Sequence, residues 1–144
     1  MSLDIFLIVK RNGERLDAAF WHNAPDICAW FENNLKSVAD GNGYPDPDVL
    51  EPVAELEPPK KGECAGNYYY PVTKQEYERL LNLCRNALTK KNSPSEIPLE
   101  IQPNAHRNDL DAYWENIELT VDQLEDAEPE INWNNDVVEF MASY

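Results

Sequence analysis

The fold is decided by residues 3–21, which read LDIFLIVKRNGERLDAAFW. Leu3–Val9 is apolar and rich in β-branched residues, a pattern typical of a buried strand. Asn12-Gly13 follows, and this pair is the strongest short hairpin signal because both central residues of a type I′ turn need a positive φ. We therefore predict a β-hairpin whose second strand runs from Arg15 to Trp21.

The segment after the hairpin has the pattern of an amphipathic helix. Asn23 is the expected N-cap of a helix that begins at Ala24-Pro25 and ends at Asp40-Gly41. Gly41–Gly66 then holds four of the five glycines and five of the eleven prolines. Because structureless connections rarely exceed about 12–15 residues, we interpret it as a functional or mobile loop. The apolar face of the helix consists of Ile27, Trp30, Phe31, Leu35 and Val38.

A capping box marks the start of the next helix. Asn67–Val72 is rich in aromatic residues and predicts a strand before it. Thr73 and Glu76 follow at the spacing at which a hydroxyl and a carboxylate satisfy each other's backbone donors. The helix behind them has an apolar face of Tyr77, Leu80, Leu81, Cys84, Ala87 and Leu88.

The last third of the chain predicts a helix and a strand. The helix is expected from Asp109 to Ala127, ended by Pro129, and the strand at Val137–Tyr144. The element order is ββ-α-β-α-α-β. We predict one α+β domain over residues 1–144, in which three amphipathic helices pack on a small, mostly antiparallel sheet of about four strands. The apolar stripe of the third helix is Leu110, Tyr113, Trp114, Ile117, Val121 and Leu124.

The charge is unusual in size and in placement. Twelve Lys and Arg against 27 Asp and Glu give a net charge of −15. Eleven of the acidic residues lie after Arg107, in a stretch without Lys, Arg or His. Such a charge repels nucleic acid and anionic membranes and favours solubility or basic partners. We therefore expect a monomer or a dimer that binds neither nucleic acid nor membrane directly.

Cysteine usage and hydropathy favour a cytoplasmic protein. Cys28, Cys64 and Cys84 are an odd number without paired spacing, which favours a reducing compartment. Ile5–Val9 has only five consecutive apolar residues, too few for a signal sequence or a membrane span. The sequence has no zinc-ligand spacing, dinucleotide fingerprint or phosphate-binding loop, so we expect no cofactor and no metal.

The predicted third helix carries its carboxylates in one row. At about 100° per residue they fall on an outward arc of about 80°, beside the apolar stripe. The row is about 21 Å long at 1.5 Å per residue, a loose match to the repeat of phosphates along DNA. Two interpretations stay open: a nucleic-acid mimic for a basic groove, and a solvated helix face. The row is Asp111, Glu115, Glu118, Asp122 and Glu125, and the charge continues through Asp126, Glu128, Glu130, Asp136 and Glu139.

Two small constellations suggest catalysis. Gly62–Gly66 places Cys64 between glycines as in a nucleophile elbow, although here a loop precedes and a strand follows. His106 with Asp109 is a candidate general base and its orienter, with helix capping as the alternative. The other histidine, His22, follows a strand and is expected to make a local hydrogen bond.

Two aromatic positions suggest contact surfaces. In the run Tyr68–Tyr70 the middle ring, Tyr69, is expected to point to the opposite face of the strand from its neighbours. That second face is either covered by the long loop or open to a partner. Trp133 lies in a polar, acidic segment, which makes it a candidate interface anchor, with burial as the alternative.

Three segments resemble a family of small tailed-phage and prophage proteins that has no established activity. The segments are residues 1–7 (MSLDIFL), 19–31 (AFWHNAPDICAWF) and 72–84 (VTKQEYERLLNLC). The family has Met-Gly-Leu-Asp in the first, an x-Ile-His-x-Trp-Phe motif in the second and Val-Ser-x-Glu in the third. The acidic, aromatic helix from Asp111 also has a counterpart. The resemblance implies a phage origin and transfers no catalytic residue.

Among small phage proteins, strong acidity favours inhibitors of host defence that mimic DNA. We therefore expect a non-enzymatic anti-CRISPR or anti-restriction protein in the host bacterial cytoplasm, bound to a basic, nucleic-acid-binding Cas effector or restriction enzyme. The alternatives are a protein-binding module that uses residues 41–66 and exposed aromatics, and a small enzyme that uses Cys64 or His106. The expected contact residues are Asp111, Glu115, Glu118, Asp122, Glu125, Asp126, Glu128 and Trp133.

Overall fold

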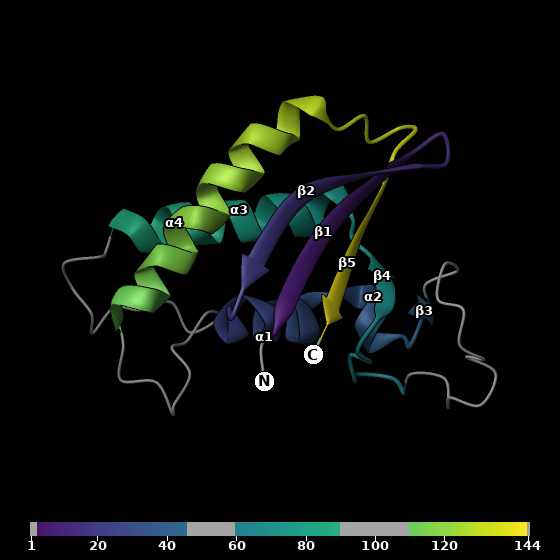
Figure 1. Ribbon diagram of the computed structural model, residues 1–144, viewed down its shortest axis with the longest axis horizontal. Coiled ribbons are helices and arrows are strands. Elements are labelled where there is room, and N and C mark those ends of the chain that lie inside the picture. The colour runs from purple at the N-terminus through teal and green to yellow at the C-terminus, as the bar shows by residue number, and fades with distance from the viewer. Residues whose placement is uncertain (1–2, 46–59, 90–109, 144) are drawn as a thin grey trace.

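The computed structural model describes residues 3–45, 60–89 and 110–143. Figure 1 shows a twisted sheet with helices on one side of it and at one edge. The expected start of the third helix at Asp109 lies outside the described residues. In chain order the elements are β1 (Asp4–Arg11), β2 (Glu14–His22), α1 (Pro25–Asn34), α2 (Lys36–Ala39), β3 (Tyr44–Pro45), β4 (Tyr68–Pro71), α3 (Lys74–Thr89), α4 (Leu110–Ala127), the 3₁₀ turn η3 (Glu128–Glu130) and β5 (Val137–Ser143).

The predicted α+β class is confirmed, with one strand more than expected. The five described strands form one sheet in the order β2-β1-β5-β4-β3, and every neighbouring pair is antiparallel. The additional strand, β3, is two residues long and pairs Tyr44 with Tyr69. Two residues are too few to show an alternating pattern, so no periodicity predicts this strand.

The β1–β2 hairpin has the predicted turn and one irregularity. Asn12 has φ 52° and Gly13 has φ 81°, as a type I′ turn requires. Leu7 pairs with Ala19, but Ile8 pairs with Asp17, so Ala18 is an extra residue in β2. A β-bulge of this kind bends the strand and strengthens its twist. It lies on the edge strand of the sheet, next to α4.

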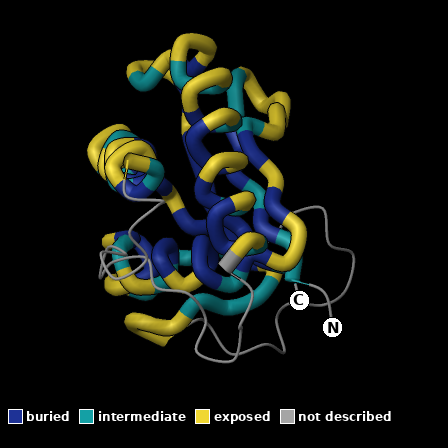
Figure 2. Tube along the Cα trace, turned by 90° about the vertical axis from the view of Figure 1, so that its left-hand side faces the viewer, coloured by how far each residue is buried: buried dark blue, intermediate teal, exposed yellow. Residues whose placement is uncertain are grey.

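The main core lies between the helices and one face of the sheet (Figure 2). Phe31 of α1 stacks on Phe140 of β5 with ring centroids 4.4 Å apart, and Trp21 of β2 meets Phe31 edge-on. Tyr68 and Tyr70 belong to this core. Tyr69 points to the other face, as predicted, and packs there in a second apolar cluster with Ile8 and Met141.

The capping box at α3 is confirmed and serves a second helix as well. Thr73 N–H donates to Glu76 Oε1 at 2.9 Å, and Glu76 N–H donates to Thr73 Oγ1 at 3.1 Å. Glu76 Oε2 accepts the N–H of Lys36 at 2.8 Å, at the start of α2. The sequence did not predict the helix break next to this contact. Leu35 has an extended backbone, with ψ 126°, and divides the expected single helix into α1 and α2.

The predicted N-cap of α1 is wrong. Ala24 occupies the N-cap position and makes no side-chain capping bond. Asn23 instead has φ 55°, donates its N–H to Leu3 O at 2.7 Å and accepts the Leu3 N–H on Oδ1 at 3.1 Å. Asparagine tolerates this left-handed backbone better than most residues, so it serves the strand end here rather than the helix.

Candidate functional site

The rotation of α4 about its axis is fixed from two sides. Trp21 Nε1–H of β2 donates to Thr120 Oγ1 at 2.9 Å, and the Tyr77 hydroxyl of α3 donates to Leu124 O at 2.6 Å. The predicted apolar stripe faces inward, so the opposite arc of the helix must face outward. The buried members of the stripe are Tyr113, Trp114, Ile117, Val121 and Leu124; the side chain of Leu110 lies outside the described residues.

The predicted acidic row is exposed along the outer face of α4. Arg85 of α3 forms an ion pair with one member, Glu125, at 2.8 Å between Nε and Oε1. Asp111 and Glu118 have interactions of their own. Glu115 and Asp122 take part in none of the ion pairs between described residues. The exposed carboxylates are Asp111, Glu115, Glu118, Asp122, Glu125 and the neighbouring Asp126, whereas Glu128 in η3 is half-buried.

Two carboxylates expected to extend this charge are buried instead. Arg11 binds Asp136 with two hydrogen bonds, Nε to Oδ1 at 3.0 Å and Nη2 to Oδ2 at 2.7 Å. The Arg11 bonds and the Asn132 N–H lower the pKa of Asp136 to about 2. Glu139 lies 3.0 Å from the ammonium of Lys10, and its side chain is only 1% exposed. These two negative charges are therefore neutralised within the fold.

Trp133 contributes to the core as well as to the surface. Its ring is half-buried and meets Tyr77 edge-on, with centroids 5.4 Å apart. The ring also borders a hollow that Glu125 and Glu128 line. Part of the indole thus holds the segment after η3 against α3, and the rest lies beside the acidic row.

Of the two catalytic candidates only Cys64 is described, and its surroundings do not activate the thiol. Burial raises the pKa of the Cys64 thiol to about 12, which keeps it protonated and poorly nucleophilic at neutral pH. His22 Nδ1 lies 2.7 Å from Asp4 Oδ1, which confirms the predicted local hydrogen bond. His106 and Asp109 lie outside the described residues. Within residues 3–45, 60–89 and 110–143, no group of His, Cys, Asp and Glu is placed to hold a metal ion.

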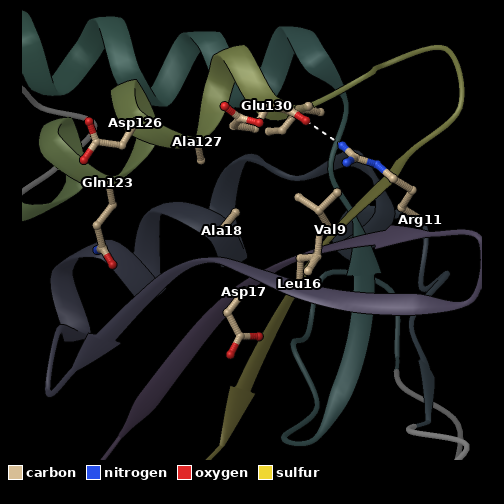
Figure 3. A pocket seen from close by; sticks show the side chains of 10 residues that line it. Val9, Arg11, Leu16, Asp17, Ala18, Gln123, Asp126, Ala127 and Glu130 are labelled. Carbon is tan, nitrogen blue, oxygen red and sulfur yellow. Dashed lines mark hydrogen bonds between the residues drawn. The ribbon is translucent and has the colours of Figure 1, made fainter.

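A cleft of about 410 Å³ lies beside the acidic row, between the hairpin and the C-terminal part of α4 (Figure 3). Sequence reasoning missed it. The cleft depends on the bulge at Ala18 and on the turn η3, neither of which leaves a periodic signal. Its apolar surface is formed by Val9, Leu16, Ala18, Ala127 and Ile131.

Comparisons of the chain with protein-family models, with curated proteins and with solved structures gave no significant match. In the described part of the chain, no helix has both the length and the apolar character needed to cross a membrane.

Proposed function

We propose that the protein is a phage-encoded inhibitor of a host defence system. It binds a basic, nucleic-acid-binding Cas effector or restriction enzyme through the outer face of α4 and occupies the place of the nucleic acid. The phage origin rests on the resemblance of the three segments described above. The observation that carries the proposal is the exposed carboxylate row on a helix whose rotation is fixed by Trp21 and Tyr77.

Electrostatics supports a basic partner. Successive members of the row are three or four residues apart, which is about 4.5–6 Å along the helix axis. This is shorter than the Debye length of about 8 Å at physiological ionic strength, so the row acts on a partner as one extended negative charge. A cationic groove that receives phosphates presents the complementary potential. Association is then fast at low salt and weakens steeply as salt is added.

Charge reversal on α4 tests the proposal. The variant Glu115→Lys/Asp122→Lys changes two exposed carboxylates that take part in none of the described ion pairs, so the fold should persist. A matched control, Glu14→Lys/Glu63→Lys, changes the net charge equally at exposed positions away from α4. Partners are captured from a bacterial lysate at low and high salt and identified.

We expect the α4 variant to lose its partner and the control to retain it. The loss should exceed tenfold in affinity, because each reversal replaces an attraction by a repulsion. The captured protein should bind nucleic acid, and duplex DNA or RNA should displace it. Equal binding by wild type and the α4 variant, or an equal loss in the control, would contradict the proposal.

A further inference from the structure

The cleft beside α4 has an apolar floor that is wide enough for a ligand. Its volume of about 410 Å³ falls within the range of about 300–1,000 Å³ that is typical of binding pockets. Val9 and Leu16 from the hairpin lie opposite Ala127 from α4 (Figure 3). Leu16 is 47% exposed, although it is a large apolar residue. The floor is therefore apolar surface that nothing among the described residues covers completely.

The two ends of the cleft differ in charge. Figure 3 shows Arg11 at one end and Asp126 at the other, with the apolar side chains between them. The Arg11 guanidinium is neutralised by Asp136 and also donates to Glu130 O at 2.5 Å. The Asp126 carboxylate is exposed and takes part in none of the ion pairs between described residues. Glu130 and Asp17 add two further carboxylates to the lining, of which Asp17 pairs with Arg15 at 3.5 Å, so the cleft as a whole favours a cation.

The edge strand that borders the cleft is closed to strand addition. Ala18 forms a bulge that interrupts regular pairing, and Gln123 Oε1 already accepts the outward N–H of Phe20 at 2.9 Å. Bulges and capped backbone groups are the means by which edge strands avoid pairing with further strands. An incoming segment would therefore insert a side chain into the cleft instead of adding a strand.

Further apolar side chains lie on the elements that form the cleft. Four large apolar residues are exposed in the described part of the chain: Leu16, Phe20, Leu119 and Val137. Leu16 of β2 lines the cleft and Leu119 belongs to α4, whereas the Phe20 ring packs on Phe6 beside the second apolar cluster, on the other face of the sheet. Exposed apolar groups rimmed by charge are typical of protein contact surfaces. This favours a side chain of a protein as the occupant over a free ion.

We propose that the cleft receives an Arg or Lys side chain of the partner protein, with the aliphatic stem on Val9 and Leu16 and the cationic head at Asp126. Long basic side chains often bury their stem while the head stays at a polar rim. The inference rests on the proposed function, because it assigns a pocket to the same basic partner. At about 100° per residue, Asp126 lies between the acidic row and the cleft-facing Gln123, so one partner surface reaches both.

A small cation tests the cleft without the partner. The probe is hexylguanidinium, titrated to about 20 mM into the ¹⁵N-labelled protein, since ligands of this size bind in the millimolar range. Hexanol and hexanoate have the same apolar body with no charge and with a negative charge. We expect hexylguanidinium to shift the amide signals of Val9, Leu16 and Ala18 with saturation, and hexanoate to leave them in place.

Matched variants separate the cleft from general attraction to an acidic protein. Asp126→Asn should weaken the binding of hexylguanidinium by about two- to fivefold, the upper part of the range for an exposed charge pair, whereas Glu115→Gln should leave its affinity unchanged. Ala127→Leu should block the cleft. The inference is overturned if the probe causes no saturable shifts, if hexanoate binds as tightly, or if Asp126→Asn and Glu115→Gln act alike.

The outcome for the cleft can be read separately from the outcome for α4. If Glu115→Lys/Asp122→Lys loses the partner but hexylguanidinium does not bind in the cleft of the wild type, the inference fails and the proposed function stands. If the probe occupies the cleft in wild type but that same variant keeps its partner, the proposed function fails and a cation-binding cleft remains.

Discussion

Removal of the Tyr77 hydroxyl should weaken the attachment of α4 to α3. Tyr77 is 2% exposed, and its hydroxyl donates to Leu124 O at 2.6 Å, near the C-terminal end of α4. The substitution Tyr77→Phe deletes this donor and keeps the ring that packs on Trp133. It therefore tests a single hydrogen bond between the two helices, without opening a large cavity.

The expected loss is about 1–2 kcal/mol in the free energy of unfolding. A typical intramolecular hydrogen bond contributes about 0.5–1.5 kcal/mol, and a buried group that loses its partner costs about 1–3 kcal/mol. Leu124 is itself fully buried, so its carbonyl has limited access to water. Urea unfolding at neutral pH measures the loss as a lower midpoint at unchanged slope.

The contribution of the Tyr77 hydroxyl to stability should also depend on pH in the alkaline range. Burial, assisted by the negative charge of Glu128, raises the pKa of Tyr77 in the folded state. In the unfolded chain a tyrosine loses its proton near pH 10. The stabilisation is thus fully present below about pH 10 and is lost as pH rises toward the folded pKa. The difference in stability between wild type and Tyr77→Phe should therefore shrink above pH 10.

The matched control is Tyr68→Phe. Tyr68 is also buried, at 7% exposed, but its hydroxyl takes part in none of the hydrogen bonds of the described residues. This variant should differ from wild type by less than about 0.5 kcal/mol. If Tyr77→Phe is equally neutral, or if the two variants lose the same stability, the helix-to-helix hydrogen bond does not hold α4 as argued.

Two further predictions concern groups outside α4. The Arg11 hydrogen bonds hold the pKa of Asp136 at about 2, so the stabilisation by this pair is present above about pH 4 and is lost as pH falls toward 2. Asp136→Asn should therefore flatten this part of an acid unfolding curve followed by circular dichroism. An unchanged slope would count against the pair. A Cβ at Gly43 would lie 2.6 Å from Cζ of the buried Tyr70 ring, so Gly43→Ala should cost about 1–3 kcal/mol. Gly13→Ala has open space but φ 81°, and should cost about 1 kcal/mol; the reverse order in urea unfolding would contradict the packing argument.

Local signals in the sequence predicted most of the fold. The Asn12-Gly13 turn and the capping box of Thr73 and Glu76 each depend on residues within four positions of one another. The apolar stripe of α4 depends on spacing along one helix. Where a preference is local it can be read without knowing the rest of the chain. The break at Leu35 was missed because it depends on another helix: the N–H of Lys36, which follows the break, donates to Glu76 of α3. No local pattern in the sequence reveals this contact.

The candidate site was predicted only where it depends on one helix. The exposed row follows from the stripe, because burying one side of α4 leaves the other side to solvent. The cleft requires a bulge in β2, a turn after α4 and the approach of these two elements. The two polar ends of the cleft cannot be recognised in the sequence, because Arg11 and Asp126 are far apart along the chain. They line one cleft only because α4 packs beside the hairpin at the edge of the sheet.

The net charge of −15 overstates the acidity of the surface, because some carboxylates are buried and paired. Asp136 and Glu139 belong to the acidic C-terminal stretch, yet each is held by a basic residue of β1, 125 and 129 positions earlier. Glu139 lies on the central strand β5 and Asp136 directly precedes it; a buried carboxylate must be paired, and β1 is the neighbour of β5 in the sheet. On α4, Glu125 pairs with Arg85, whereas Glu115 and Asp122 take part in none of the ion pairs between described residues. Asp136 and Glu139 therefore add little to the exposed negative charge, and variants at Asp136 should change stability before they change the proposed binding.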